Sequence, residues 1–152
     1  MHNHRLVLLL SGSLLAAAPV SPPARAAYIF GYAPGTLGNA PDTACLTVNG
    51  PGSAAVLWPC GNISFIMGQQ WSLDGFQITT QGLCLDTQGG ALTKGTPVTV
   101  EPCIGSASQT WIYNNGAITT GNGMCLTLAP IVQNPASISP CAGLVSQSFG
   151  II

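Results

Sequence analysis

The sequence contains very few charged residues and almost no histidine. Lys, Arg, Asp and Glu together make up 5% of its 152 residues. Both histidines and two of the three basic residues lie in the first 26 positions, which leaves Lys94 as the basic residue of the remaining chain. One lysine is too few for the phosphate contacts that nucleic-acid binding requires. Without histidine, the remaining chain also lacks the usual means for zinc binding and for Ser-His or Cys-His catalysis.

Long hydrophobic runs are also missing. The most apolar stretch is residues 6–18, and its roughly 13 residues fall short of the about 20 that a membrane-spanning helix needs. A basic head precedes this stretch, and the tripeptide ARA that ends at Ala26 has the small residues of a signal-peptidase site. We therefore expect residues 1–26 to be a signal peptide, with a membrane anchor as the weaker alternative. Residues 27–152 are then expected to form one secreted, extracellular domain.

Cysteine, by contrast, is plentiful, and all six cysteines follow the expected signal peptide. An even number of cysteines behind a signal peptide indicates an oxidising compartment and a disulfide framework. Six cysteines allow 15 different pairings, so their number alone selects none of them.

The cysteines mark a threefold internal repeat. In each unit the first cysteine precedes leucine, the second follows proline, and the unit closes with glutamine, any residue and an aromatic residue. The three sets are Cys45-Leu46, Pro59-Cys60 and Gln69-x-Trp71; Cys84-Leu85, Pro102-Cys103 and Gln109-x-Trp111; and Cys125-Leu126, Pro140-Cys141 and Gln147-x-Phe149. A period of about 40 residues indicates a repeat architecture. The units are expected at roughly 37–71, 76–111 and 117–149, and are called units one, two and three below.

Within the units the pattern is that of short strands. Val98 and Val100 alternate with threonine, the period of a half-buried strand. Asp-Gly at Asp74 and Asn-Gly at Asn115 are strong hairpin signals, and no stretch shows a helical stripe. We expect about four strands per unit and twelve in total, closed into a barrel because one unit cannot bury its own apolar side. The recurring leucines and closing aromatic residues are placed in the shared core.

These three units resemble the ricin B-type lectins, which are β-trefoils and are also classified as carbohydrate-binding module family 13. The resemblance runs from about Leu37 to Phe149, and Phe149 departs from it by replacing tryptophan. It implies an all-β, β-trefoil fold of three repeats. Equivalent units favour three disulfides within the repeats, and bridges between units are the alternative. The pairs expected are Cys45–Cys60, Cys84–Cys103 and Cys125–Cys141.

The resemblance also implies a sugar site in each unit. It requires an Asp two residues after the first cysteine, an aromatic ring two residues before the second, and polar residues near the closing Gln. In unit one Thr47 replaces the Asp, while Trp58 and Gln69 are present. Unit one therefore keeps the ring that would stack on a sugar and lacks the carboxylate, and a core or rim position for Trp58 is the alternative.

Unit two keeps the opposite half of the site. Asp86 is present, Ser108 and Gln109 occupy the polar positions, and Glu101 replaces the aromatic ring. The alternative for Asp86 is a turn residue that accepts from nearby backbone N–H groups. Because a carboxylate is the harder element to replace, unit two is favoured over unit one as the sugar site, with weak affinity.

Unit three has Thr127 and Ser139 at these positions, so no family-type site is expected there. A carboxylate pair such as Asp86 and Glu101 can cleave glycosides, but without further support we expect no enzyme, and neither a metal nor a cofactor. We expect a lectin-like protein with weak or altered specificity for a galactose- or xylose-type glycan. The alternative is a trefoil that binds or inhibits a protein partner.

Two local features complete the analysis. Asn62 begins an Asn-Ile-Ser acceptor pattern for N-glycosylation, in a connection that is longer in unit one than in the other units. Residues 28–35 contain three aromatic residues and have no counterpart in the repeats. They are expected either to form the first strand of the barrel or to pack on a partner.

Overall fold

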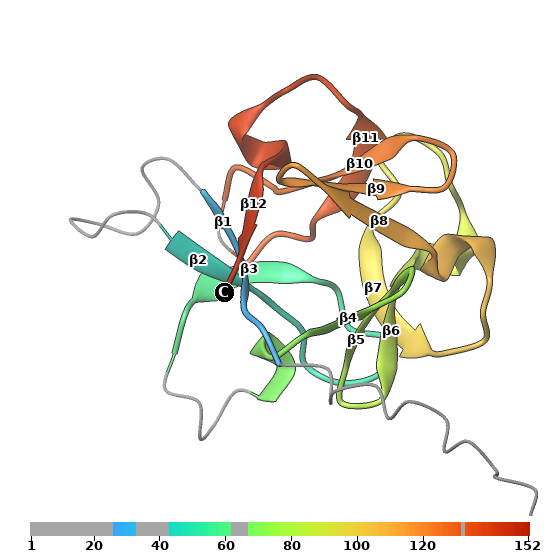
Figure 1. Ribbon diagram of the computed structural model, residues 1–152, viewed down its shortest axis with the longest axis horizontal. Coiled ribbons are helices and arrows are strands. Elements are labelled where there is room, and N and C mark those ends of the chain that lie inside the picture. Colours follow the sequence, from blue (N-terminus) through green and yellow to red (C-terminus); the bar gives the residue numbers. More distant parts are fainter. Residues whose placement is uncertain (1–25, 33–42, 62–66, 132) are drawn as a thin grey trace, which may run out of the picture.

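A computed structural model describes residues 26–32, 43–61, 67–131 and 133–152 (Figure 1). The expected signal peptide before Ala26 and the acceptor Asn62 lie outside these residues, so both stay predictions. In the described part of the chain no helix is long and apolar enough to cross a membrane.

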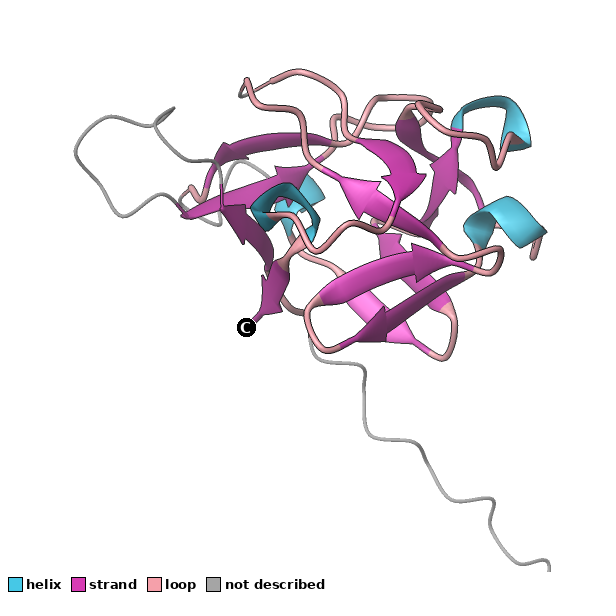
Figure 2. Ribbon diagram, turned by 90° about the horizontal axis from the view of Figure 1, so that it is seen from above, coloured by secondary structure: helices cyan, strands magenta, loops and turns pink. Residues whose placement is uncertain are grey.

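The described residues form twelve strands and four 3-10 helices of three residues each. The strands are β1 (Ile29–Tyr32), β2 (Thr43–Thr47), β3 (Val56–Pro59), β4 (Ser72–Asp74), β5 (Gln77–Thr80), β6 (Leu83–Thr87), β7 (Val98–Pro102), β8 (Trp111–Asn114), β9 (Ala117–Thr120), β10 (Met124–Thr127), β11 (Ser137–Pro140) and β12 (Phe149–Ile151). The 3-10 helices are η1 (Met67–Gln69), η2 (Gln88–Gly90), η3 (Ala107–Gln109) and η4 (Val145–Gln147). Figure 2 shows the 3-10 helices as single turns between strands.

The strands make three antiparallel sheets of four strands each. Two sheets are consecutive meanders, β4 to β7 and β8 to β11. The third has the order β12-β1-β2-β3, so the C-terminal strand lies beside the first strand (Figure 1). Residues 29–32 therefore supply the first strand of the barrel, which is one of the two alternatives expected for that segment.

A ring of three backbone hydrogen bonds joins the three units. The N–H of Ala55 donates to the carbonyl of Val98, that of Val98 to Ala136, and that of Ala136 back to Ala55, each at 2.8 Å. Each donor lies at or next to the start of the second strand of its hairpin. No unit can complete this ring alone, so the threefold sequence pattern corresponds to a closed, cooperative arrangement.

The recurring apolar residues form the shared core, as the repeats predict. Leu46, Leu85 and Leu126 are fully buried, and the closing aromatic residues are fully or almost fully buried. The indole N–H groups of Trp71 and Trp111 donate to the carbonyls of Leu46 and Leu85 at 2.9 and 2.8 Å. Phe149 fills the same position without a donor, so its ring preserves the packing and gives up that hydrogen bond.

All three disulfides lie within units, which confirms the expected pairing. Cys45–Cys60, Cys84–Cys103 and Cys125–Cys141 close loops with separations of 15, 19 and 16 residues. Loops of this size stabilise a fold by roughly 3 kcal/mol each when they restrict the unfolded chain. Twelve strands, three units and three internal bridges together confirm the all-β trefoil predicted from the sequence.

Candidate functional site

The glutamine that closes each unit is a buried brace. Its Nε2 donates to the side chain two residues after the first cysteine and to the carbonyl of the proline before the second cysteine. Its Oε1 accepts from the N–H of the residue after the second cysteine. The partners are Thr47, Pro59 and Gly61 for Gln69; Asp86, Pro102 and Ile104 for Gln109; and Thr127, Pro140 and Ala142 for Gln147.

This brace changes how Gln69 and Gln109 are understood as candidate sugar ligands. Both are only 1% exposed, and both hydrogens of each Nε2 are already donated to protein acceptors. The bracing contacts alone explain why glutamine recurs at this position. Direct sugar contact by either glutamine stays a prediction.

The residue that accepts from the brace differs between units. In units one and three it is a threonine, Thr47 or Thr127, whose hydroxyl also donates to the carbonyl of the preceding Cys45 or Cys125 at 2.9 and 3.0 Å. In unit two it is Asp86, which has no proton to donate when ionised. Its Oδ2 accepts from Gln109 at 3.0 Å, and its Oδ1 accepts from the backbone N–H of Thr87 at 2.7 Å.

The Asp86 carboxylate thereby replaces a backbone hydrogen bond that the other two units have. In units one and three the N–H of the next residue, Val48 or Leu128, donates to the carbonyl just before the bracing glutamine, at 3.2 and 2.8 Å. In unit two the corresponding N–H of Thr87 is taken by Asp86. The hairpin and η3 are consequently joined through side chains there, and a depression lies between them.

The depression in unit two has a volume of about 670 Å³. Its lining includes all four residues that the sequence analysis proposed for unit two, namely Asp86, Glu101, Ser108 and Gln109. Asp86 is buried at 6% exposure, whereas Glu101 is half-buried. The structure therefore brings the four candidates together, with Glu101 as the more accessible carboxylate.

The two carboxylates lie on the same face of the β6–β7 hairpin. Glu101 pairs with Cys84 in the ladder, and Asp86 pairs with Thr99 two residues further along. Residues two apart on a strand face the same side, so Asp86 and Glu101 are diagonal neighbours. The depression is accordingly anionic, and no group of three or more metal-ligating residues is found among the described residues.

Hydroxyl and apolar groups complete the unit-two depression. The hydroxyl oxygens of Ser106 and Ser108 are 2.8 Å apart and form a hydrogen bond, so Ser108 is held in place by its neighbour. Pro102, Ile104 and Ala107 supply apolar surface, and Ile104 is 78% exposed. This arrangement offers acceptors for the hydroxyl groups of a ligand and an aliphatic edge for its C–H face.

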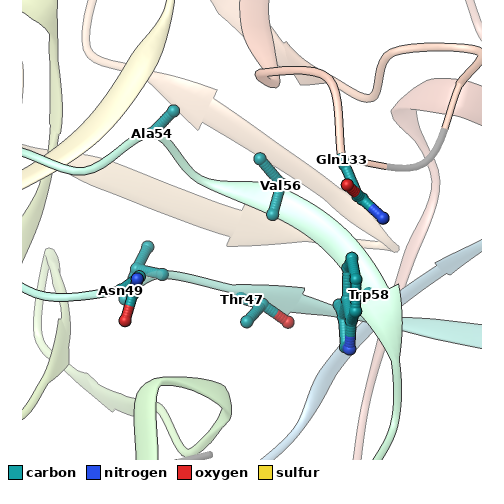
Figure 3. Close-up of a pocket in the computed structure, with 7 residues that line it drawn as sticks. Thr47, Asn49, Ala54, Val56, Trp58 and Gln133 are labelled. Carbon is teal, nitrogen blue, oxygen red and sulfur yellow. The ribbon is translucent and has the colours of Figure 1, made fainter.

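Unit one has a smaller depression of about 430 Å³ (Figure 3). Thr47 and Trp58 line it, together with Val48, Asn49, Ala54, Val56 and Gln133. Trp58 pairs with Cys45 just as Glu101 pairs with Cys84, so the ring and the carboxylate occupy equivalent ladder positions. Trp58 is 37% exposed, while Gln69 is not among the residues of the lining and lies behind Thr47.

Comparison with known proteins places this architecture in a family. Residues 33–149 match the family described as the ricin-type beta-trefoil lectin domain. The chain belongs to the ricin-type β-trefoil lectin family. No curated protein matches the sequence.

Solved structures of similar fold include several lectins. The agglutinin from Abrus precatorius superposes with a TM-score of 0.70 at 19% identity, over 89% of this chain and 51% of that one, so this lectin domain spans about half of the agglutinin chain. A non-toxic homologue of type II RIPs from Momordica charantia, solved with α-methyl-D-galactoside, has a TM-score of 0.66 at 22% identity over 85% of this chain and 48% of that chain. The earthworm R-type lectin C-half, solved with GalNAc, has a TM-score of 0.60 at 17% identity, with coverage of 83% and 97%. At these identities the likeness shows the fold.

Unit three of the lectin domain differs from the other two units in its side chains. The hydroxyl of Thr127 is engaged by Gln147 and Cys125, and Ser139 occupies the ladder position of Trp58 and Glu101. The loop of unit two also runs along β11, because Gly95 donates to the carbonyl of Ile138 at 2.7 Å. The unit thus presents neither a carboxylate nor a ring at the two candidate positions.

Sequence reasoning missed several residues of the depressions, and two of them are informative. Ile104 follows the second cysteine of unit two, where units one and three have Gly61 and Ala142, so a bulky residue at this position was a detectable signal. Gln133 belongs to unit three but lines the depression of unit one. An analysis that treated each unit separately could not place it there.

Proposed function

We propose that this lectin domain is a secreted carbohydrate-binding protein whose working site is the depression of unit two. The observation that carries the proposal is the convergence of Asp86, Glu101 and Ser108 on one depression between the hairpin and η3. Membership of a lectin family makes carbohydrate the favoured class of ligand. Binding without catalysis is proposed, because Asp86 is buried with both oxygens already accepting from Gln109 and the Thr87 N–H, which leaves Glu101 as the more accessible carboxylate.

The chemistry of the depression favours a neutral ligand rich in hydroxyl groups. Carboxylates accept hydrogen bonds from vicinal hydroxyls, and charge-assisted bonds of this kind contribute about 1.5–3 kcal/mol each. Two carboxylates on one face repel acidic sugars. A galactose- or xylose-type glycan satisfies these conditions, with its C–H face against Pro102 and Ile104 in place of an aromatic ring.

The affinity is expected to be weak. The depression is open, and it lacks the stacking ring that would contribute about 0.5–1.5 kcal/mol beyond burial. A dissociation constant in the millimolar range or slightly better corresponds to roughly −4 to −5 kcal/mol. Binding by a multivalent glycan surface would then exceed binding by a single sugar.

The test combines a glycan array with residue-resolved titration. The wild-type protein should bind galactosides or xylosides, with shifts at the backbone amides of Gly89, Gly90 and Ile104. Asp86→Thr installs the residue that units one and three use, so the glutamine brace is retained and the carboxylate is lost. This variant should lower affinity at those amides about tenfold or more. Ser139→Ala, at the equivalent position of Glu101 in unit three, is the control that should leave binding unchanged.

Two results would contradict the proposal. If Asp86→Thr binds as well as the wild type while Trp58→Ala does not, the working site is in unit one. If the wild-type protein binds nothing on a broad array, the protein has the fold without the carbohydrate-binding function. The exposed Ile104 would then favour the alternative, a protein partner that covers this apolar residue.

Secretion is part of the proposal and has its own tests. Three disulfides fit an oxidising compartment, and residues 1–26 have the pattern of a signal peptide. N-terminal sequencing of secreted protein should begin at Ala27, and a start at Met1 would overturn it. If the host glycosylates proteins, Asn62 should carry a glycan, and an unchanged mass after glycosidase treatment would contradict that.

A further inference from the structure

One loop position repeats in all three units and is occupied by a different kind of residue in unit three. Gly52, Gly95 and Gln133 each donate their backbone N–H to the second strand of a neighbouring hairpin. The acceptors are the carbonyls of Val100, Ile138 and Leu57, at 2.7, 2.7 and 3.2 Å. Each of the three donors has a positive φ, of 75°, 85° and 74°. The three loops therefore hold the same backbone conformation at the same place.

Glycine is the residue expected at such a position. A side chain in the left-handed region costs of order 1–3 kcal/mol, and glutamine lacks the tolerance that Asn and Asp show there. Gly52 and Gly95 avoid this cost, whereas Gln133 carries it. Among the described residues, two other non-glycine residues, Gln81 and Asn115, have positive φ, but each lies in a tight turn immediately before a glycine. Gln133 is therefore exceptional, because the equivalent position in each of the other two units is a glycine.

The strained position puts the Gln133 side chain at the depression of unit one. Figure 3 shows Gln133 and Trp58 on the same side of this depression, with Val56 beside them. The side chains of Asn49 and Gln133 supply amides, Val48, Ala54 and Val56 supply apolar surface, and none of the lining residues is ionisable. A ring, two amides and an apolar floor suit an uncharged sugar that presents both a C–H face and a hydrogen-bonding substituent.

We propose that Gln133 is a specificity-determining residue of a second, uncharged sugar site, which is shared between units one and three. The ring of the sugar stacks on Trp58, and the amide of Gln133 bonds its hydroxyl or N-acetyl substituent across the boundary between the units. The unit-two depression differs from this site because it recognises hydroxyls with carboxylates. This inference rests on the proposed carbohydrate-binding function. The family resemblance already implies stacking on Trp58 in unit one, and what is new is the part that Gln133 of unit three takes in that site.

The test uses Asp86→Thr as the background, so that binding in unit two is already weakened. The three tryptophans supply the readout, because Trp71 and Trp111 are buried with their indole N–H groups bonded to carbonyls while Trp58 is exposed. Titration with neutral methyl hexosides and N-acetylhexosaminides should shift the Trp58 indole resonance alone. A methyl hexuronide serves as the charged comparison in the same panel.

Gln133→Gly should have two opposite effects. The midpoint of denaturant unfolding should rise because the strain is removed, and affinity at Trp58 should fall about fivefold because one hydrogen bond is lost. Gly95→Gln is the matched control, since it introduces the same residue at the equivalent position away from both depressions. It should lower the midpoint and leave binding at Trp58 unchanged.

The outcomes separate the two proposals. If the wild-type protein binds sugar but Gln133→Gly binds as well as its background, the inference about Gln133 is wrong and the proposed function stands. Equal affinity for neutral and acidic sugars that no substitution alters would also overturn the inference. If the wild-type protein binds none of the sugars, the proposed function fails and this inference fails with it.

Discussion

The depressions of units one and two share equivalent hairpin positions, and the side chains at those positions have opposite chemistry. Trp58 and Glu101 hold the same ladder position opposite a disulfide-bonded cysteine, and Thr47 and Asp86 both accept from the glutamine brace. Unit one therefore has a ring and no charge, while unit two has charge and no ring. The brace, the disulfide and the buried leucine are common to both units. The outer face of the hairpin thus differs between two units that keep the same brace, disulfide and buried leucine.

The acceptor of the brace shows where this freedom has a structural consequence. Either a hydroxyl or a carboxylate oxygen accepts from the glutamine Nε2, so threonine and aspartate both keep the brace. A carboxylate has a second oxygen, however, and in unit two that oxygen accepts from the N–H of Thr87. In the other units the equivalent N–H groups donate to a backbone carbonyl of the next 3-10 helix. One substitution therefore alters both the charge of the depression and the way in which its walls are joined.

The largest expected effect tests whether the disulfides of units one and two contribute equally to the free energy of unfolding. Replacing both cysteines of a bridge by alanine should cost about 3 kcal/mol in either unit, because the closed loops have separations of 15 and 19 residues. Denaturant unfolding of Cys45→Ala/Cys60→Ala and Cys84→Ala/Cys103→Ala would measure this. Losses that differ by more than about 1 kcal/mol would show that the units contribute unequally to the fold.

A smaller difference is expected from the brace itself. Methionine keeps the volume of glutamine and makes none of its hydrogen bonds, so Gln69→Met should cost about 2 kcal/mol. Gln109→Met should cost about 1 kcal/mol more, since it removes a donor from the buried carboxylate of Asp86. Unfolding free energies of the two variants provide the comparison. Equal losses would mean that the Asp86 carboxylate finds another donor.

The repeats explain how much of this could be predicted from the sequence. Cysteine, leucine and glutamine recur because each has the same structural role in every unit, so the repeat indicates a closed barrel of three units with disulfides within them, and the family resemblance implies the trefoil. The positions of Trp58, Asp86 and Glu101 follow for the same reason, because each is two residues from a cysteine. These residues lie on strands whose register the disulfide fixes.

Contacts between units were beyond the reach of the same reasoning. Gln133 lines the same depression as Trp58 because the loop of unit three bonds to β3, and nothing in the local sequence of unit one indicates that pairing. The bracing role of Gln109 was also missed, since glutamine near a sugar site is equally compatible with ligand contact. Only the burial of its amide and the hydrogen bonds to Asp86 and Pro102 distinguish the two roles.

The smallest effect concerns the core side of the unit-two hairpin. Thr87 occupies the position of Val48 and Leu128, and its Oγ1 is buried with no hydrogen-bond partner among the described residues. An unpaired buried hydroxyl costs about 1–3 kcal/mol relative to a paired one. Thr87→Val preserves the shape of the side chain and the backbone N–H that Asp86 accepts. It should therefore raise the free energy of unfolding by about 1 kcal/mol.

The reverse substitution in unit one is the matched control for Thr87. Val48 is buried at 4% exposure, so Val48→Thr should lower the free energy of unfolding by about 1 kcal/mol or more. Paired denaturant curves for the two variants measure both changes. If Thr87→Val is destabilising instead, the hydroxyl has a partner that is specific to unit two, such as a buried water. Units one and two would then differ in their cores as well as on their solvent-facing sides.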